Sequence, residues 1–339
     1  LRAGEGKAYA FAFTPRDIRW DQNMVLGYFP TEGGGWARKL VPFPDVVYNR
    51  LASRAADVSA AMETLKRRFL RRNIPVFNWS FYNKWDVYRM IEGEPAAYKH
   101  VPESTINPTP ERIKEMLQRH KFIYLKPTGG SLGKGIYRIT HAPGKGYFVR
   151  FRRNGKNTLL RFQNFQSLVR MLGAGSGRLR NYVAQQGIRL IEINGCPIDF
   201  RFHLVRNQSN EWVVAGVGAK MAGRGSVTTH IKNGGTLMTP QQALGRVFGD
   251  KAGEILQRMK DVSIKLAEAI QDNSRYHVGE LGFDLGVDQN ENIWMFEANS
   301  KPGRSIFKHP ALKEEGRAAL DLVFQHCLYL AKFRKRGSS

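Results

Sequence analysis

The sequence predicts a mixed α/β and α+β protein with two or three packed units, and three observations lead to this fold class. The chain has 339 residues, 42% of them hydrophobic and 11% aromatic, which is enough for real cores and excludes global disorder. Strand-like and helix-like segments alternate along most of the chain. The clearest element is residues 279–303, GELGFDLGVDQNENIWMFEANSKPG, which predicts two strands joined by a polar turn.

Residues 1–103 are predicted to form an N-terminal α/β unit. Its expected elements are strands over 8–13, 45–48 and 74–78, a glycine loop at 33–35, a helix over 51–72, and a helix over about 82–91 that carries Lys84. The apolar stripe expected on the first helix consists of Val58, Met62, Leu65 and Phe69. The chain begins at Leu1 without an initiator methionine, so this unit could be a truncated domain.

Residues 104–182 are expected to form a smaller lobe, preceded by a proline-rich linker over 102–110. Thr109 as N-cap and Pro110 in the first turn predict the start of a helix. The other expected elements are strands over 121–127, 136–140, 147–153 and 158–162, a glycine-rich loop over 128–135, a helix over 164–172 and a loop over 173–177. Asn154-Gly155 is a strong hairpin signal between two of these strands.

Residues 183–339 are expected to form a larger lobe. Besides the hairpin of 279–303, its expected strands lie over 182–186, 198–205 and 212–221. An amphipathic helix is predicted over 251–272, because apolar residues recur there at four- and three-residue steps, and a terminal helix over 312–332.

The composition indicates an anionic partner and argues against several other classes. Lys and Arg number 53 against 29 Asp and Glu, giving a net charge of +24, which suits phosphates, an acidic substrate or another polyanion. No apolar run approaches the ~20 residues that span a bilayer, so we expect no membrane partner. Cys196 and Cys327 give no disulfide framework or zinc pattern, which favours a reducing, cytoplasmic location.

The hairpin of 279–303 carries a candidate metal site. If Val287 pairs with Trp294, Asp284 lies directly across from Glu297, and Asn299 continues the same face. Carboxylate and amide oxygens are ligands that Mg²⁺ prefers, and phosphate oxygens and water complete its octahedron. The alternative is a surface hairpin whose acidic residues are merely solvated.

The glycine-rich loop over 128–135 is a candidate phosphate cradle. Glycines let backbone N–H groups approach an anion closely, and a strand–loop–strand arrangement is typical of a lid. The GxxxxGK[ST] pattern of a P-loop is absent. The alternative is an ordinary flexible surface loop.

A third candidate surface lies on the strand over 198–205. With a four-residue turn at 207–210, Asp199 would face Gly218, Arg201 would face Gly216, and Lys220 would share their face. The glycines would then leave a vacant polar surface for a ligand. A five-residue turn would move Lys220 to the other face, and an ordinary Asp–Arg surface ladder is the alternative. A loop around His230, with Asn233 and Gly234, offers donors and room for a substrate.

Five segments resemble, in order, the motifs of the ATP-grasp superfamily, and within it the YheC/YheD group of endospore-coat-associated ATP-grasp proteins. They are NWSFYNKWD, YLKPTGGSLGKGIYRI, DFRFHLVRN, GAKMAGRG and ELGFDLGVDQNENIWMFEANSKPG. The resemblance covers roughly residues 75–307. It implies an ATP-grasp fold, in which two α+β lobes clamp a nucleotide, with residues 1–103 as the preceding α/β domain, 104–182 as the small lobe and 183–339 as the large lobe.

The resemblance also implies a role for each matching residue. ATP phosphates would be contacted by Lys84, Lys126 and the lid residues Thr128, Gly129, Gly130, Ser131, Gly133, Lys134 and Gly135. The adenine would meet the hinge residues Gln185, Gln186 and Ile188, where Gln185-Gln186 replaces the Glu-containing hinge of many relatives. Asp199 would lie near the ribose or the catalytic centre, and Arg201, Lys220 and Arg224 would steady the γ-phosphate and an acyl phosphate. The implied magnesium ligands are Asp284, Glu297 and Asn299, and the implied substrate contacts are Asn233, Gly234 and Arg304.

The resemblance implies an ATP-dependent carboxylate–amine ligase with two Mg²⁺ ions, an acyl-phosphate intermediate, and an acid and an amine as substrates. Three alternatives remain open: a phosphotransferase that acts on a hydroxyl, a non-catalytic spore-coat component that retains ATP binding, and a basic polyanion or nucleic-acid binder. The first would need a general base that the sequence does not offer. The intact metal ligands argue against the second, and no nucleic-acid module is recognised for the third.

Overall fold

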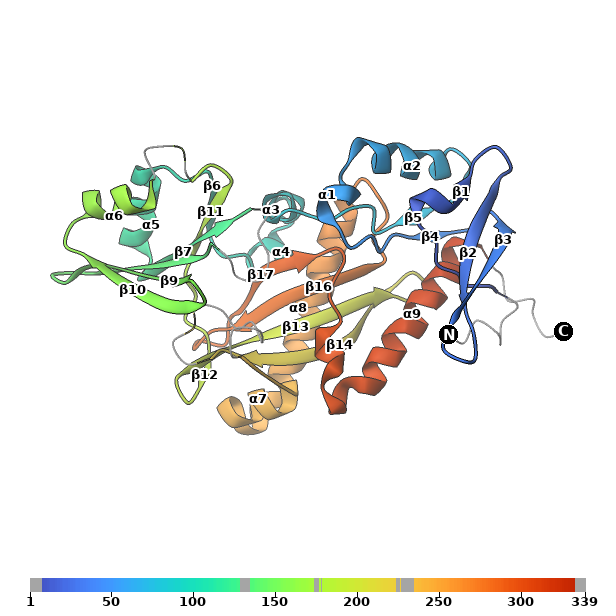
Figure 1. Ribbon diagram of the computed structural model, residues 1–339. Coiled ribbons are helices and arrows are strands. Elements are labelled where there is room, and N and C mark those ends of the chain that lie inside the picture. Colours follow the sequence, from blue (N-terminus) through green and yellow to red (C-terminus); the bar gives the residue numbers. More distant parts are fainter. Residues whose placement is uncertain are drawn as a thin grey trace.

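The computed structural model describes residues 8–128, 135–173, 177, 179–223, 226 and 235–332 (Figure 1). No helix within these ranges combines the length and apolar character needed to cross a bilayer. Figure 1 shows a small sheet with its helices at one end and a long sheet with α8 (Ala252–Asp272) and α9 (Lys313–Leu330) in the middle. The elements of residues 8–77 lie at the other end, and those of residues 84–98 lie between the small sheet and α8. We propose that these parts correspond to the three units expected from the sequence.

The large lobe is built on an antiparallel sheet in the order β15-β14-β13-β16-β17, with β12 paired to β13. Its strands are β12 (Glu192–Ile193), β13 (Cys196–Arg206), β14 (Trp212–Met221), β15 (Thr236–Met238), β16 (Glu280–Val287) and β17 (Ile293–Asn299). Its helices are α7 (Pro240–Phe248), α8 (Ala252–Asp272) and α9 (Lys313–Leu330), with short 3₁₀ turns at η4 (Gly249–Lys251), η5 (Ser305–Lys308) and η6 (Pro310–Leu312). The sequence did not predict α7, β12 or β15.

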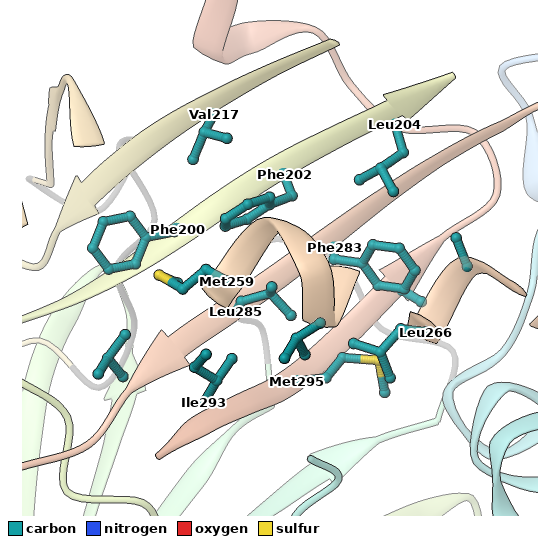
Figure 2. Packing of buried hydrophobic residues seen from close by; sticks show 14 of the residues in the cluster. Phe200, Phe202, Leu204, Val217, Met259, Leu266, Phe283, Leu285, Ile293 and Met295 are labelled. Atoms are coloured by element: carbon teal, nitrogen blue, oxygen red, sulfur yellow. The ribbon is translucent and has the colours of Figure 1, made fainter. Parts of the chain in front are cut away.

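The main core lies between this sheet and α8. Alternate residues of the central strands, such as Phe202 and Phe283, point to the helix and are fully buried, as are Met259 and Leu266 of α8 (Figure 2). Burying such side chains stabilises the fold by roughly 1.5–3 kcal/mol each. Because side chains alternate along a strand, the intervening residues of β13 and β16 lie on the opposite face of the sheet.

That opposite face is partly covered by η5 and α9. A Cβ atom built on Gly216 would lie 2.5 Å from Phe307, and one built on Gly218 would lie 2.8 Å from Ile306. The expectation that these two glycines leave a vacant surface for a ligand is therefore wrong. They leave room for apolar side chains of η5, which closes this part of the sheet.

A β-bulge sets the register of β16 and β17. Asp284 pairs with Glu297 as expected, but Val287 pairs with Ile293 and not with Trp294. Phe296 is the extra residue between these two stretches of regular pairing. In a regular strand Glu297 would share the face of Met295, which is fully buried in the core. The bulge turns Glu297 and Asn299 to the opposite face.

A second bulge sets the register of β13 and β14. Arg206 pairs with Trp212, so the connecting loop has five residues, and Ala215 is an extra residue in β14. Asp199 consequently faces Lys220, and Arg201 faces Gly218. The predicted pairing of Asp199 with Gly218 was wrong by two residues. The prediction that Asp199, Arg201 and Lys220 share one face of the sheet was nevertheless right. The fifth loop residue and the extra residue Ala215 each shift the register of β14 by one, so the two shifts together leave Lys220 on the predicted face.

The small lobe is a six-stranded antiparallel sheet in the order β10-β9-β8-β7-β11-β6, with two helices on one face. Its elements are β6 (Ser104–Ile106), α5 (Pro110–Arg119), β7 (Phe122–Pro127), β8 (Tyr137–Ala142), β9 (Gly146–Arg153), β10 (Lys156–Phe162), α6 (Phe165–Leu172) and β11 (Tyr182–Gln186). The predicted hairpin at Asn154-Gly155 is confirmed, since both residues have positive φ angles of 49° and 76°. The predicted linker over 102–110 instead contains edge strand β6, which pairs with β11.

The N-terminal unit differs most from expectation. Its elements are η2 (Pro15–Asp17), β1 (Ile18–Arg19), β2 (Met24–Pro30), β3 (Trp36–Pro42), β4 (Val47–Tyr48), α1 (Arg54–Asp57), α2 (Ala60–Leu70) and β5 (Val76–Phe77). The next two helices, α3 (Lys84–Glu92) and α4 (Pro95–Tyr98), contribute buried residues to the main core of the large lobe. The hairpin of β2 and β3 was not predicted, although the glycine loop at 33–35 joins its strands. The helix predicted over 51–72 is two helices, because Ser59 caps the start of α2 and Val58 is 59% exposed.

Candidate nucleotide and metal site

The candidate metal ligands Asp284, Glu297 and Asn299 lie together on the face of the large sheet that points away from α8. Asp284 is directly opposite Glu297, and Asn299 is directly opposite Gly282. The side chains of Asp284 and Glu297 are 13% and 35% exposed, so both can reach a ligand.

Two cations from the neighbouring strands neutralise the carboxylate of Asp284. Its Oδ1 lies 2.8 Å from the Lys220 ammonium and 3.2 Å from Nε of Arg201. Lys220 also lies 3.0 Å from Oδ1 of Asp199, directly across from it on β13. Burial lowers the pKa of Lys220, but the carboxylates of Asp199 and Asp284 outweigh burial and raise it above its ordinary value. Lys220 is therefore a permanent cation.

Lys84 reaches the site from the first turn of α3, which Asn83 caps by accepting a hydrogen bond from the Asp86 N–H at 2.8 Å. The Lys84 ammonium donates to Oε1 of Glu297 at 3.2 Å. α3 follows strand β5 of the N-terminal unit, so this contact joins that unit to the large sheet.

Lys126 comes from β7 of the small lobe and is partly buried. Its ammonium lies 5.2 Å from the centre of the Tyr124 ring and 5.8 Å from that of Phe296, and it donates to Gln185. Burial, helped by the nearby charge of Lys84, lowers the pKa of Lys126 to about 8, against the attraction of Glu297 and two other site carboxylates. The small lobe thus places a titratable cation over the same acidic cluster.

The hinge residues are occupied by contacts within the protein. The Gln185 amide donates to the Tyr88 hydroxyl at 2.6 Å while its oxygen accepts from Lys126. The side-chain oxygen of Gln186 accepts from the backbone N–H of Glu103 at 3.1 Å, and the backbone N–H of Gln186 donates to the Glu103 carbonyl at 2.8 Å. Ile188 is half-buried in the segment that leads into the large lobe. The side chain of Gln185 therefore holds Lys126 in place.

Part of the expected site lies outside the described residues. This applies to Gly129, Gly130, Ser131, Gly133 and Lys134 of the loop, and to Arg224, His230, Asn233 and Gly234. The two ends of the loop are described: the Thr128 N–H donates to the Asn181 carbonyl at 2.8 Å, and Gly135 has a φ angle of 72°, which favours glycine.

Arg304, expected to hold a substrate carboxylate, is bound to a carboxylate of the protein itself. Its Nη2 donates to Oε1 of Glu280 at 2.9 Å. Glu280 is fully buried and also receives hydrogen bonds from His203 at 2.8 Å, Arg50 at 3.4 Å and the Tyr48 hydroxyl. Burial raises the pKa of Glu280, but the hydrogen bond from His203 and the arginine charges outweigh it and lower the pKa to about 2.

Sequence reasoning missed this buried cluster around Glu280. One signal could have revealed it, because Glu280, Gly282 and Asp284 alternate with the apolar residues of β16 and so share one face. The partners Tyr48 and Arg50 are more than 200 residues away in sequence, and no local pattern points to them.

The side chains present fit a magnesium nucleotide. Their donors are carboxylate and amide oxygens, and four cations (Lys84, Lys126, Arg201 and Lys220) face three carboxylates (Asp199, Asp284 and Glu297), which leaves an excess of positive charge for phosphates. No group of three or more His, Cys, Asp or Glu residues in the described part of the chain could enclose a metal alone. A Mg²⁺ ion here would thus take further oxygens from Asn299, phosphate and water.

A cavity of 1710 Å³ lies elsewhere, between the N-terminal β-hairpin, α2 and α9. Its lining is mainly apolar and includes none of the candidate nucleotide and metal ligands, although Tyr48 and Arg50 of the cluster around Glu280 belong to it. Size alone would make it the default binding site, but the cluster of charged groups at the sheet is the better candidate because catalytic chemistry requires such groups.

Comparison with known proteins gives matches over most of the chain. The family described as YheC/D like ATP-grasp matches residues 73–330. The endospore coat-associated protein YheD of Bacillus subtilis is 35% identical over 96% of this chain and 71% of its own length. YheC of the same organism is 23% identical over 93% of this chain and 86% of its own length.

Solved structures with modest similarity include a ligase and a carboxylase. A D-alanine–D-alanine ligase from Coxiella burnetii has a TM-score of 0.46 and 9% identity, over 91% of this chain and 77% of its own. A biotin carboxylase β-γ-ATP complex from Campylobacter jejuni has a TM-score of 0.48 and 12% identity, over 86% of this chain and 56% of its own.

Proposed function

Because this chain belongs to the YheC/D-like ATP-grasp family, we propose that it binds ATP with Mg²⁺ at the site between the two lobes and is an ATP-dependent carboxylate–amine ligase. The ATP-grasp fold itself implies ATP binding. The identity of the reaction is the part that is proposed.

One observation carries the proposal. Asp284 and Glu297 lie opposite each other on adjacent strands and are ringed by cations from β7, β13, β14 and α3. Charged groups that gather, largely buried, on one face of a sheet stabilise a fold poorly. They are well suited to hold phosphate oxygens and a hard cation.

We assign each residue a role on this basis. Asp284, Glu297 and Asn299 would hold Mg²⁺, which supplies neutralisation of phosphoryl charge when bound. Lys84, Lys126 and the loop over 128–135 would contact the phosphates, and Asp199 would keep Lys220 oriented. Arg201 and Lys220, with Arg224, would stabilise the charge that develops on the transferred phosphoryl group.

The proposed reaction forms a C–N bond in two steps. A carboxylate substrate attacks the γ-phosphorus of ATP, so that the bond to the β–γ bridging oxygen breaks and an acyl phosphate and ADP form. An amine then attacks the acyl carbon and displaces inorganic phosphate with loss of a proton. No covalent protein nucleophile is needed. Arg201 and Lys220 contribute only by stabilising the negative charge of the phosphoryl group.

We revise the role of Arg304. Its contact with Glu280 makes it part of the wall of the substrate site, with only Nε among its buried nitrogens lacking a hydrogen-bond partner in the described part of the chain. The proposed substrate contacts of Asn233 and Gly234 stand as expectations from the sequence.

A second candidate function rests on the names of the relatives. YheD and YheC are endospore coat-associated proteins, so we propose that this chain, too, is made in the cytoplasm and associates with a spore coat. A coat component that binds ATP without turning it over would keep the carboxylate pair and would release no ADP in the presence of any acid and amine.

Glu297→Gln tests the proposed site. Calorimetric titration should show saturable binding of Mg²⁺–ATP to the wild type, weaker binding without Mg²⁺, and binding at least ~10-fold weaker in Glu297→Gln, because the amide lacks the negative charge with which the carboxylate attracts Mg²⁺. ADP release with a panel of acids and amines should be lost as well. Glu192→Gln is the matched control, since Glu192 is exposed on β12. Unchanged affinity in Glu297→Gln would overturn the metal assignment.

A further inference from the structure

The small-lobe sheet has a second face, opposite α5 and α6, that carries a group of arginines. Cross-strand partners share a face, so Arg138 of β8 lies beside Arg150 of β9, and Arg150 lies beside Leu159 of β10. Arg152 and Arg161 alternate onto the same side. We call Arg138, Arg150, Arg152 and Arg161 the basic face. Figure 1 shows both helices on the other side of this sheet.

The basic face continues directly from the candidate nucleotide site. Arg138 pairs with Tyr124 of β7, and Lys126 lies two residues further along β7 on the same face. Neighbouring strands are about 4.8 Å apart, so Arg138 and Arg150 lie roughly 5 and 10 Å from β7 across the sheet. The pKa of Tyr124 is raised by burial, lowered by Arg138 and Arg150, and raised by Asp199, so all three charges act on one phenol between the lobes.

Arg138 and Arg150 form no ion pair with another side chain in the part of the chain that the structure describes. Like charges directly opposite each other on adjacent strands are destabilising. In the described part of the chain no ion pair involves Arg138, Arg150 or Arg152, although other arginines of the small lobe, such as Arg112 and Arg119, bind Glu103. The undescribed segments contain a single acidic residue, Glu5. An anion from outside the chain would relieve this repulsion.

Arg138 is also held in a fixed position. Its guanidinium lies over the Phe122 ring at 4.2 Å from the centre, and its buried Nε has no hydrogen-bond partner in the described ranges. A guanidinium that is already ordered loses less entropy on binding, and its planar fork matches a carboxylate.

The rings on this face are not open for stacking with nucleic-acid bases. Arg138 covers Phe122, and Arg161 lies over Phe148 at 5.8 Å while donating to the Lys145 carbonyl at 2.9 Å. Proteins that bind single strands combine charge with aromatic side chains on which the bases stack. The face supplies charge without such a platform, which favours carboxylates over a nucleic acid.

We infer that the basic face binds an acidic polypeptide, whose carboxylates pair with Arg138 and Arg150 and whose reacting group reaches the candidate nucleotide site. This inference rests on the proposed function, because it identifies the substrate class of the proposed ligase as a carboxylate-rich peptide. It assigns Arg138 and Arg150 to substrate positioning, outside the nucleotide site.

The test compares peptide binding with nucleotide binding in the same variants. The probe is a fluorescein-labelled ten-residue polyglutamate, titrated with protein at 0.15 M salt and followed by fluorescence anisotropy. The double variant Arg138→Gln/Arg150→Gln should bind it at least ~10-fold more weakly than the wild type. Mg²⁺–ATP affinity by calorimetry should stay within about twofold. Arg153→Gln is the matched control, because Arg153 is exposed on the same strand and faces the other way. Arg150→Gln alone serves if the double variant does not fold.

Each other outcome overturns the inference. Equal loss of peptide binding in Arg153→Gln would mean general attraction by net charge. Tighter binding of a ten-nucleotide oligothymidylate, lost in the double variant, would assign the face to nucleic acid. Loss of Mg²⁺–ATP affinity in the double variant would place the arginines in the nucleotide site. Failure of the wild type to bind Mg²⁺–ATP is a separate result, which sinks the proposed function and leaves the peptide measurement interpretable.

Discussion

At the scale of single residues, Lys126 is the group whose protonation should control nucleotide binding. It is a cation below its lowered pKa of about 8 and neutral above it, and a bound triphosphate favours the charged form. Affinity for Mg²⁺–ATP should therefore fall as pH rises from 7 to 9.5, by about tenfold per unit well above the pKa of the free protein.

Calorimetry at four or five pH values checks this, with Lys126→Arg as the comparison. Arginine stays charged throughout this range, so the variant should lose the dependence on pH even if its affinity differs. A wild-type affinity that is constant from pH 7 to 9.5 would contradict the role given to Lys126.

The sequence predicted the residues of the candidate metal site but did not predict the buried cluster around Glu280 beside it. Asp284, Glu297, Lys220 and Arg201 alternate with apolar residues on strands, and alternation together with an assumed hairpin register predicted that they share one face. For Lys220 the predicted face was right only because the longer loop and the bulge in β14 compensate for each other. Glu280 could not be assigned in the same way, because a buried carboxylate is recognised only by its partners, and these come from distant parts of the chain. A glutamine at position 185 has a physical reason that the sequence did not show, since its amide oxygen accepts from Lys126 and its amide nitrogen donates to Tyr88.

At the scale of elements, most predicted strands were found and their registers were partly wrong, while the strand predicted over 8–13 is only an isolated bridge at Ala12. A bulge adds one residue without changing the composition of a strand, so neither Ala215 nor Phe296 is marked in the sequence. The prediction of one continuous helix over 51–72 was wrong for a related reason, since α1 and α2 occupy this range. Its apolar spacing is helical throughout, but the hydroxyl of Ser59 accepts from the Met62 N–H and starts a new helix.

The contact between β14 and η5 gives a prediction about stability. Gly218→Ala would place a methyl group 2.8 Å from Ile306 Cγ2, so we expect a loss of about 1–3 kcal/mol in the free energy of unfolding. Gly253→Ala in α8 has nothing within 4 Å and should gain about 0.5–1 kcal/mol, because alanine is a better helix former. Urea denaturation measures the free energy of unfolding of both variants, which should fall in Gly218→Ala and rise in Gly253→Ala. Equal effects would mean that η5 does not pack on β14.

At the scale of the whole molecule, a pair of histidines joins three parts of the chain. The Nε2 atoms of His277, which precedes β16, and His326 of α9 share a hydrogen bond at 2.8 Å, and His326 packs edge-on against Phe77 of β5 at 5.3 Å. Burial, with help from Arg206, lowers the pKa of His277 to about 4, and burial and His277 lower that of His326 to about 3.

This pair should make the assembly of the three parts sensitive to acid. The unfolded histidines take up protons near pH 6.5 and the folded ones only near 4 and below, so stability that is fully present above pH 6.5 is lost as pH falls towards 4. The loss should be on the order of 3 kcal/mol. Thermal unfolding by circular dichroism should show a steeper decline over this range in the wild type than in His326→Gln. His141→Gln, on the small lobe, should behave like the wild type.

The two bulges also matter for anyone who aligns this chain with its relatives. A relative whose loop after β13 is one residue shorter and whose β14 lacks the extra residue at Ala215 would present the same lysine opposite Asp199. Its alignment would show two separate gaps around an unchanged site, whereas a single gap in either place would exchange the inner and outer faces of the strand. Insertions and deletions in this family should therefore occur here in pairs, and a lone one would mark a member that no longer keeps this lysine at its site.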